Sequence, residues 1–133
     1  MSKKIYIIAV LIIILIGFSI FEVNYAKNTI TNLQSELVEL KSAIGTQIDD
    51  DNINTESISL QAEESQAYWN QRESILCLIF NHNDMKEIGK EITQIISYLE
   101  QQDLQEAFVH TDLAIQQVTT LTHLIQFNIQ NIL

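Results

Sequence analysis

The pattern of hydrophobic positions divides the chain into one uninterrupted apolar run and several amphipathic segments. The run, Ile5 to Phe21, contains no charged side chain. A helix rises about 1.5 Å per residue. Extended through Val23 and Tyr25, the run therefore comes close to the ~30 Å hydrocarbon thickness of a bilayer. The pattern predicts a transmembrane anchor over residues 5–25.

Two lysines, Lys3 and Lys4, come directly before this run. Because basic residues flank membrane spans on the cytoplasmic side, residues 1–4 are predicted to be cytoplasmic and residues 26–133 to lie outside the cytoplasm. A cleaved signal peptide is the alternative, since it also combines basic residues with an apolar segment. We favour an uncleaved, single-pass anchor in the cell membrane, because Asn24 occupies the −3 position of the nearest candidate cleavage site.

Beyond the anchor, apolar residues continue at alternating steps of three and four. This seam consists of Val23, Ala26, Ile30, Leu33, Leu37, Leu40 and Ile44. The spacing places these residues on one side of a single long helix, which we expect to leave the bilayer and end near Gly45. Later helices of the same chain or a second copy must cover the seam. We favour packing within the chain, because the seam is short for an independent coiled coil.

The rest of the chain predicts three further helices. The second helix is expected from about Asn54 to Asn81, after a loop over residues 46–55 that is rich in Asp and Asn. Asp84 and Asp103 each precede a glutamate by three residues, which is the spacing of a helix N-terminal capping box. The last two helices are almost contiguous, so they must fold back on each other. The predicted fold class is all-α, a transmembrane helix continuing into a small antiparallel bundle of two helix hairpins.

Several large apolar residues are candidate anchors, either of the core or of a partner contact. They are Trp69, Leu33, Leu37, Leu40 and Phe108. We expect Trp69 to lie in the core with its indole N–H near a polar edge, and an exposed contact for a partner is the alternative. On the last helix, Leu113, Leu121 and Leu124 widen the apolar face, which indicates that two neighbours cover it.

Charge and composition narrow the function classes. After Phe21, where the apolar run ends, five basic residues stand against 17 acidic ones, a net charge of −12. Nucleic acid is therefore excluded as a partner, and a basic or cationic partner remains compatible. The absence of proline and the presence of only three glycines favour helices. The single cysteine, Cys77, lies in an apolar segment and is interpreted as a buried thiol, with an intermolecular disulfide as the alternative.

Candidate chemistry is sparse. The loop around Asp49 to Asp51 resembles the start of a calcium loop, but Thr55 replaces the required glycine and Gln61 the final glutamate. The three histidines have no metal-ligand spacing; they are His82, His110 and His123. We therefore predict no catalytic residue, cofactor or metal site, and keep cation or pH sensing as a distant alternative.

The favoured function is a non-enzymatic binding or accessory module for another membrane protein. The alternative is a homodimeric structural element assembled through the seam at residues 30–44.

Short motifs support a family resemblance over nearly the full length. They are the lysine-preceded anchor, Trp69, the segment Leu78-Ile79-Phe80-Asn81-His82, Tyr98-Leu99-Glu100, Asp103 with Glu106-Ala107, and the ending Asn131-Ile132-Leu133. On these motifs the chain resembles a bacterial family of membrane-anchored helical proteins of unknown function. The resemblance implies an anchored helical fold, and it implies no activity and no functional residue.

Overall fold

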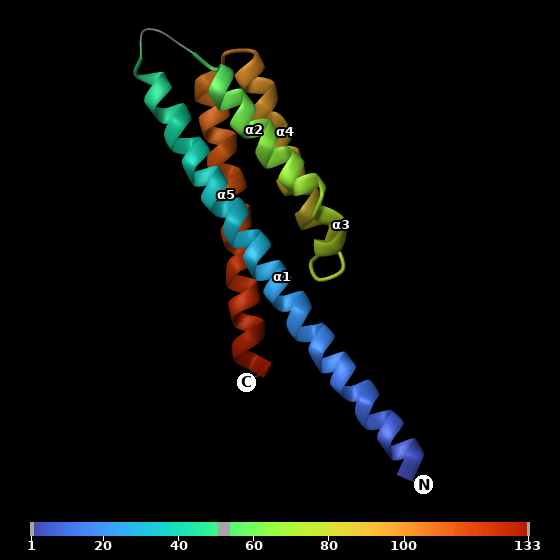
Figure 1. The fold of residues 1–133 in the computed structure, drawn as a ribbon. Coiled ribbons are helices and arrows are strands. Elements are labelled where there is room, and N and C mark those ends of the chain that lie inside the picture. Colours follow the sequence, from blue (N-terminus) through green and yellow to red (C-terminus); the bar gives the residue numbers. More distant parts are fainter. Residues whose placement is uncertain (1, 51–53, 133) are drawn as a thin grey trace.

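The chain forms five helices in the part that the computed structural model describes, which comprises residues 2–50 and 54–132, with side chains described for residues 3–50 and 54–127. The helices are α1 (Ser2–Ile48), α2 (Glu56–Asn70), α3 (Glu73–Leu76), α4 (His82–Glu100) and α5 (Leu104–Ile132). No strand occurs among these described residues. Helices α1 and α2 form one antiparallel hairpin, and α4 and α5 form the other (Figure 1). The predicted all-α bundle of two hairpins is confirmed.

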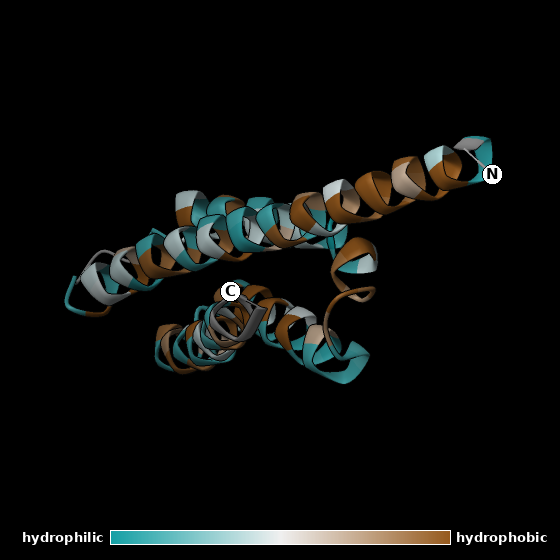
Figure 2. Ribbon diagram, turned by 90° about the horizontal axis from the view of Figure 1, so that it is seen from below, coloured by the Kyte–Doolittle hydropathy of each residue, from teal (hydrophilic) through white to brown (hydrophobic). Residues whose placement is uncertain are grey.

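Helix α1 runs without interruption from the apolar run into the bundle. Its first part projects beyond the other helices (Figure 1), and Figure 2 shows that this projecting part is the hydrophobic one. The large apolar residues of the run are exposed, whereas the seam from Ala26 to Ile44 is buried. Among the described helices, α1 alone is long and apolar enough to cross a membrane.

The expected end of α1 at Gly45 is wrong, since the helix continues to Ile48. A Cβ atom on Gly45 would lie 3.4 Å from Cε2 of Phe108, so this glycine allows the Phe108 ring of α5 to approach α1 closely. Residues 46–48, which were expected in a loop, are helical instead, and residues 51–53 lie outside the described residues. The predicted acidic loop around Asp49 to Asp51 therefore falls partly outside the structure.

The expected single helix from Asn54 to Asn81 is also wrong, because it is divided after Asn70. At the break, Arg72 Nη1 donates to the carbonyl oxygen of Tyr68 at 3.0 Å, and the guanidinium lies 3.7 Å from the centre of the Tyr68 ring. The last carbonyls of a helix lack donors within the helix. Arg72 supplies one from outside and so stabilises the end of α2 at this point.

The two predicted capping signals have different outcomes. Asp103 behaves as predicted, since its Oδ1 accepts from the Glu106 N–H at 3.2 Å at the start of α5. Helix α4 begins earlier than the signal at Asp84 indicates. Its N-cap is Asn81, whose Oδ1 accepts from the Asn83 N–H at 2.9 Å, and Asp84 lies within the first turn.

One hydrophobic core connects α1, α2, α4 and α5. Trp69 of α2 is fully buried in this core. Gly89 makes room for it on α4, because a Cβ atom at Gly89 would lie 3.0 Å from Trp69 Nε1. The expected polar surroundings of the indole are wrong, since Nε1 is buried and has no hydrogen-bond acceptor among the described residues.

Candidate functional site

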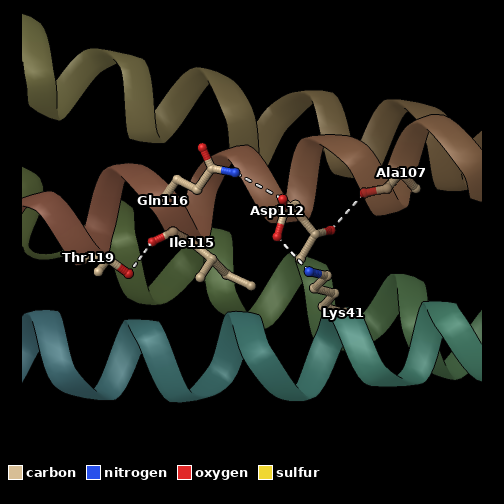
Figure 3. A network of polar contacts seen from close by, with 7 residues as sticks. Lys41, Ala107, Asp112, Ile115, Gln116 and Thr119 are labelled. Carbon is tan, nitrogen blue, oxygen red and sulfur yellow. Dashed lines mark hydrogen bonds and ion pairs between the residues drawn. The ribbon is translucent and has the colours of Figure 1, made fainter.

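Polar pairs spaced by seven residues fix α5 along α1. Lys41 Nζ donates to Asp112 Oδ1 at 2.5 Å, and one heptad away Gln34 Nε2 donates to Thr119 Oγ1 at 2.9 Å. Figure 3 shows the first of these contacts, with Asp112 also accepting from Gln116 Nε2 at 3.0 Å on the same helix. The Lys41 ammonium, together with a hydrogen bond from Gln116, lowers the pKa of Asp112. These contacts set the antiparallel register of α1 and α5.

The register continues toward the projecting half of α1. Another heptad on, Lys27 and Gln126 line the same small hollow of about 110 Å³, together with Ile30 and Ile125. Six residues beyond the Lys27–Gln126 level, the same antiparallel register places the backbone of Ile132 level with Phe21 of α1. Helix α5 therefore extends to the level where the apolar run of α1 ends, and its end is already separated from α1 (Figure 1).

Helix α4 holds the opposite flank of α5. His110 Nδ1 lies 2.6 Å from Glu91 Oε2, and the imidazole is stacked on Tyr98 with ring centres 5.1 Å apart. The side chains of His110 and Glu91 are both largely buried. Nearer the start of α4, Asp84 and Glu87 share a small hollow with Gln117 and Leu121 of α5, among other residues. Contacts on both flanks prevent α5 from rotating about its axis.

Between these two flanks, α5 presents a face that no described helix covers. The outer stripe of α5 consists of Val109, Leu113, Gln116, Thr120, Leu124 and Phe127. Its four apolar members are 38–63% exposed. Steps of three and four residues place all six side chains on one side of the helix. On α1, the half-exposed Val38 lies between Gln34 and Lys41 and extends this apolar surface across the first flank.

The outer stripe differs from the rest of the domain in charge. No Asp, Glu, Lys or Arg occurs from Leu113 to the end of the chain, although residues 22–133 carry a net charge of −12. Exposed acidic residues lie instead on the other helices, on the turn before α5 and on the first turn of α5, as at Glu56, Glu63, Asp103 and Glu106. An uncharged surface of aliphatic, hydroxyl and amide groups is suited to binding another protein surface.

The residues singled out as anchors in the sequence are placed in the core. Leu33, Leu37, Leu40 and Trp69 are all at most 1% exposed, and Phe108 is partly buried against the core. Phe108 also makes a cation–π contact with Lys41, whose Nζ lies 5.0 Å from the ring centre. The seam is thus covered within a single chain, so the surface required by the homodimer hypothesis at residues 30–44 is already occupied.

The histidines and the cysteine are distributed over separate contacts. His110 pairs with Glu91, His82 Nδ1 lies 3.1 Å from Cys77 Sγ, and His123 is exposed on α5. The predicted burial of Cys77 is only partly confirmed, because the thiol is half-buried. Within the described ranges, no three His, Cys, Asp or Glu side chains gather as metal ligands.

Sequence reasoning missed the two most informative features of α5. The pairing of His110 with Glu91 joins different helices and leaves no signal in local spacing. The outer stripe does leave a signal in the sequence. Apolar residues occur on a side of the helix that faces neither α1 nor α4, and no charged residue follows Asp112. Two neighbours do cover α5 as expected, but Leu113 and Leu124 remain exposed, while Leu121 is buried.

Comparison with known proteins gives one match. A sequence model for the family described as "Domain of unknown function (DUF4363)" matches residues 21–132. The matched region begins at the last residue of the apolar run and covers all of the helical bundle. No curated protein and no solved structure matches the chain.

Proposed function

The chain belongs to the DUF4363 family, whose description names no activity, and from its surface we propose that it is a membrane-anchored, non-enzymatic accessory module. In this proposal α1 spans the cell membrane with residues 1–4 in the cytoplasm. The bundle lies outside and binds another membrane protein through the outer stripe of α5.

The observation that carries the proposal is the uncharged, exposed stripe on a helix that runs alongside the anchor. Phe127, its most exposed apolar member, lies with Leu124 toward the end of α5 that reaches the level of the anchor's exit. A partner with its own transmembrane span is already confined to the same membrane. It would therefore lose less translational freedom on binding this surface than a soluble partner would. Exposed aliphatic and aromatic groups would be buried in that contact.

The net charge favours a different protein over a second copy of this one. Residues 22–133 of each chain carry a net charge of −12, and the stripe is flanked on α4 by Asp84 and Glu87. Two copies would bring these like charges together across a shared interface. A partner with a neutral or basic surface would avoid this repulsion.

The test is site-specific photo-crosslinking of the full-length protein in its native membrane. A photoreactive residue replaces Thr120, in the middle of the stripe, and in a matched control it replaces Glu63, which is exposed on α2. We expect Thr120 to capture one discrete membrane protein, identified by mass spectrometry, and Glu63 not to capture it. The substitution Phe127→Asp should abolish capture, whereas Leu60→Asp on α2 should not.

Two results would contradict the proposal. Capture of only a second copy of the chain at Thr120 would support a homodimer formed through α5. Equal capture of the same proteins at Thr120 and Glu63 would mean that the stripe is not a specific interface.

A further inference from the structure

The turn after α3 exposes a second apolar surface, separate from the stripe on α5. Leu78 is 78% exposed, more than any large apolar residue of the anchor, where Tyr6 has the highest value at 73%. Ile75 is also exposed, and Ile79 and Phe80 are half-buried against the core. No Asp, Glu, Lys or Arg occurs between Glu73 and Asp84. An exposed cluster of this kind on a charged domain indicates a binding surface.

The backbone N–H groups of this turn are paired within the chain. The N–H groups of Cys77 and Leu78 donate to the carbonyls of Glu73 and Ile75, and those of Ile79 and Phe80 both donate to Leu76, at 2.8–3.1 Å. Backbone donors that are paired internally can enter an apolar medium without an unsatisfied hydrogen bond.

The polar side chains of the turn are similarly compatible with an apolar medium. Cys77 Sγ lies 3.1 Å from His82 Nδ1, which connects the turn to the start of α4. Desolvation, reinforced by the charge of Glu73, raises the pKa of Cys77, so the thiol stays uncharged at neutral pH.

The turn lies at the end of the bundle where the anchor emerges. Near the end of α2, the Tyr68 hydroxyl lies 3.5 Å from the carbonyl oxygen of Thr29, and α3 continues from there toward the hydrophobic half of α1 (Figure 2). At this level of α1, the rings of Phe21 and Tyr25 are stacked with centres 6.2 Å apart. Aromatic residues are enriched where spans cross the boundary between hydrocarbon and water.

We propose that the turn at residues 75–80 inserts into the lipid interface of the membrane that holds α1. The occupant of this surface is a lipid bilayer, because the cluster is aliphatic and aromatic, lies level with the anchor's exit (Figure 1), and contains no charge for a specific polar contact. The bundle would then contact the membrane at two separated points, which fixes its tilt and the direction in which the α5 stripe faces. This inference rests on the proposed anchoring of α1.

The test uses depth-dependent fluorescence quenching in the full-length protein. Single tryptophans are introduced by Leu78→Trp, by Leu60→Trp as the matched control, and by Phe18→Trp as a reporter of the anchor. Leu60 is also an exposed leucine, but it lies on the first turns of α2, away from the anchor. The proteins are reconstituted into phosphatidylcholine–phosphatidylglycerol vesicles with or without brominated acyl chains. The buried Trp69 of the unmodified protein gives the baseline.

We expect bromine to quench the Leu78→Trp and Phe18→Trp variants strongly, with blue-shifted emission, and to leave the Leu60→Trp variant at the baseline. Quenching of Phe18→Trp without quenching of Leu78→Trp would overturn this inference and leave the anchor intact. Equal quenching at positions 78 and 60 would overturn it too, because the whole bundle would then lie on the bilayer. An unquenched Phe18→Trp variant would overturn the anchoring and the inference together.

Discussion

At the scale of single residues, Gln102 has the least favourable backbone conformation among the described residues. It has φ of 58° in the turn between α4 and α5. The Asp103 N–H donates to the carbonyl of Tyr98 at 2.9 Å, and the Gln102 N–H donates to Leu99 at 3.0 Å. These two bonds form a Schellman motif, whose left-handed position is usually occupied by glycine.

Replacing Gln102 by glycine should therefore stabilise the bundle. We expect the free energy of unfolding to rise by up to about 1 kcal/mol, because glycine removes the left-handed strain but is more flexible in the unfolded chain. Urea denaturation in detergent micelles measures the change, with Gln101→Gly, in the right-handed region, as the control that should destabilise. A decrease for Gln102→Gly would show that the glutamine side chain stabilises the turn.

Glu36 predicts a dependence of stability on pH. Desolvation at the contact of α1 with α2 raises its pKa, against the opposing effects of a hydrogen bond from Ser65 and the charge of Arg72. A raised pKa means that the folded chain binds this proton more tightly than the unfolded chain. The contribution of Glu36 to stability is therefore complete below its ordinary value of 4.5 and is lost as the pH rises through the folded-state value.

The substitution Glu36→Gln should remove this dependence while keeping an acceptor for Ser65. We expect the variant to be more stable than the unmodified protein at neutral pH, by less than about 1 kcal/mol, because the group is partly solvated. Thermal unfolding from neutral pH to pH 4.5 should show the difference shrinking as the pH falls. A difference that is constant over this range would exclude the titration of Glu36 as its cause.

At the scale of elements, the seam of α1 is the part of the bundle most sensitive to substitution. Leu37 is fully buried, and the adjacent Val38 is 50% exposed. Truncating a buried leucine side chain alone lowers the free energy of unfolding by about 2–5 kcal/mol. Aspartate at position 37 would in addition place a charge in the core. We expect Leu37→Asp to abolish cooperative unfolding and Val38→Asp to leave it intact, as measured by circular dichroism.

The same pair of variants distinguishes the two interpretations of the seam. If Leu37→Asp left a folded monomer while the unmodified protein was a dimer, then the seam would join two chains in solution. Analytical ultracentrifugation of both variants in detergent gives that information.

At the scale of the whole molecule, the distribution of charge on the two sides of the apolar run predicts the orientation of the protein in the membrane. Lys3 and Lys4 precede the apolar run, and residues 22–133, which follow it, carry a net charge of −12. In a Cys77→Ser background, we expect cysteine at the exposed Glu63 to react with a membrane-impermeant maleimide on intact cells. Cysteine at Lys3 should react only after permeabilisation. The reverse pattern would invert the orientation, and loss of the first residues from the mature protein would indicate a cleaved signal peptide.

The linear sequence determined the features that depend on local periodicity. Alternating steps of three and four predict which side of α1 is buried, because a helix brings such positions onto one face regardless of what covers them. The same applies to the cap at Asp103 and to the order of the two hairpins. The continuation of α1 past Gly45 and the break after Asn70 were not predictable in this way, because Phe108 packs against α1 at Gly45 and Arg72 stacks on Tyr68 at the break.

Only the tertiary structure decided which apolar residues remain at the surface. Leu113, Leu121 and Leu124 are equivalent in the sequence pattern, yet packing against α4 buries Leu121 and leaves the other two exposed. The pairing of Glu91 with His110 and the exposure of Leu78 are of the same kind. Periodicity defines the faces of one helix, but the neighbour that covers each face is set by contacts between residues far apart in the chain.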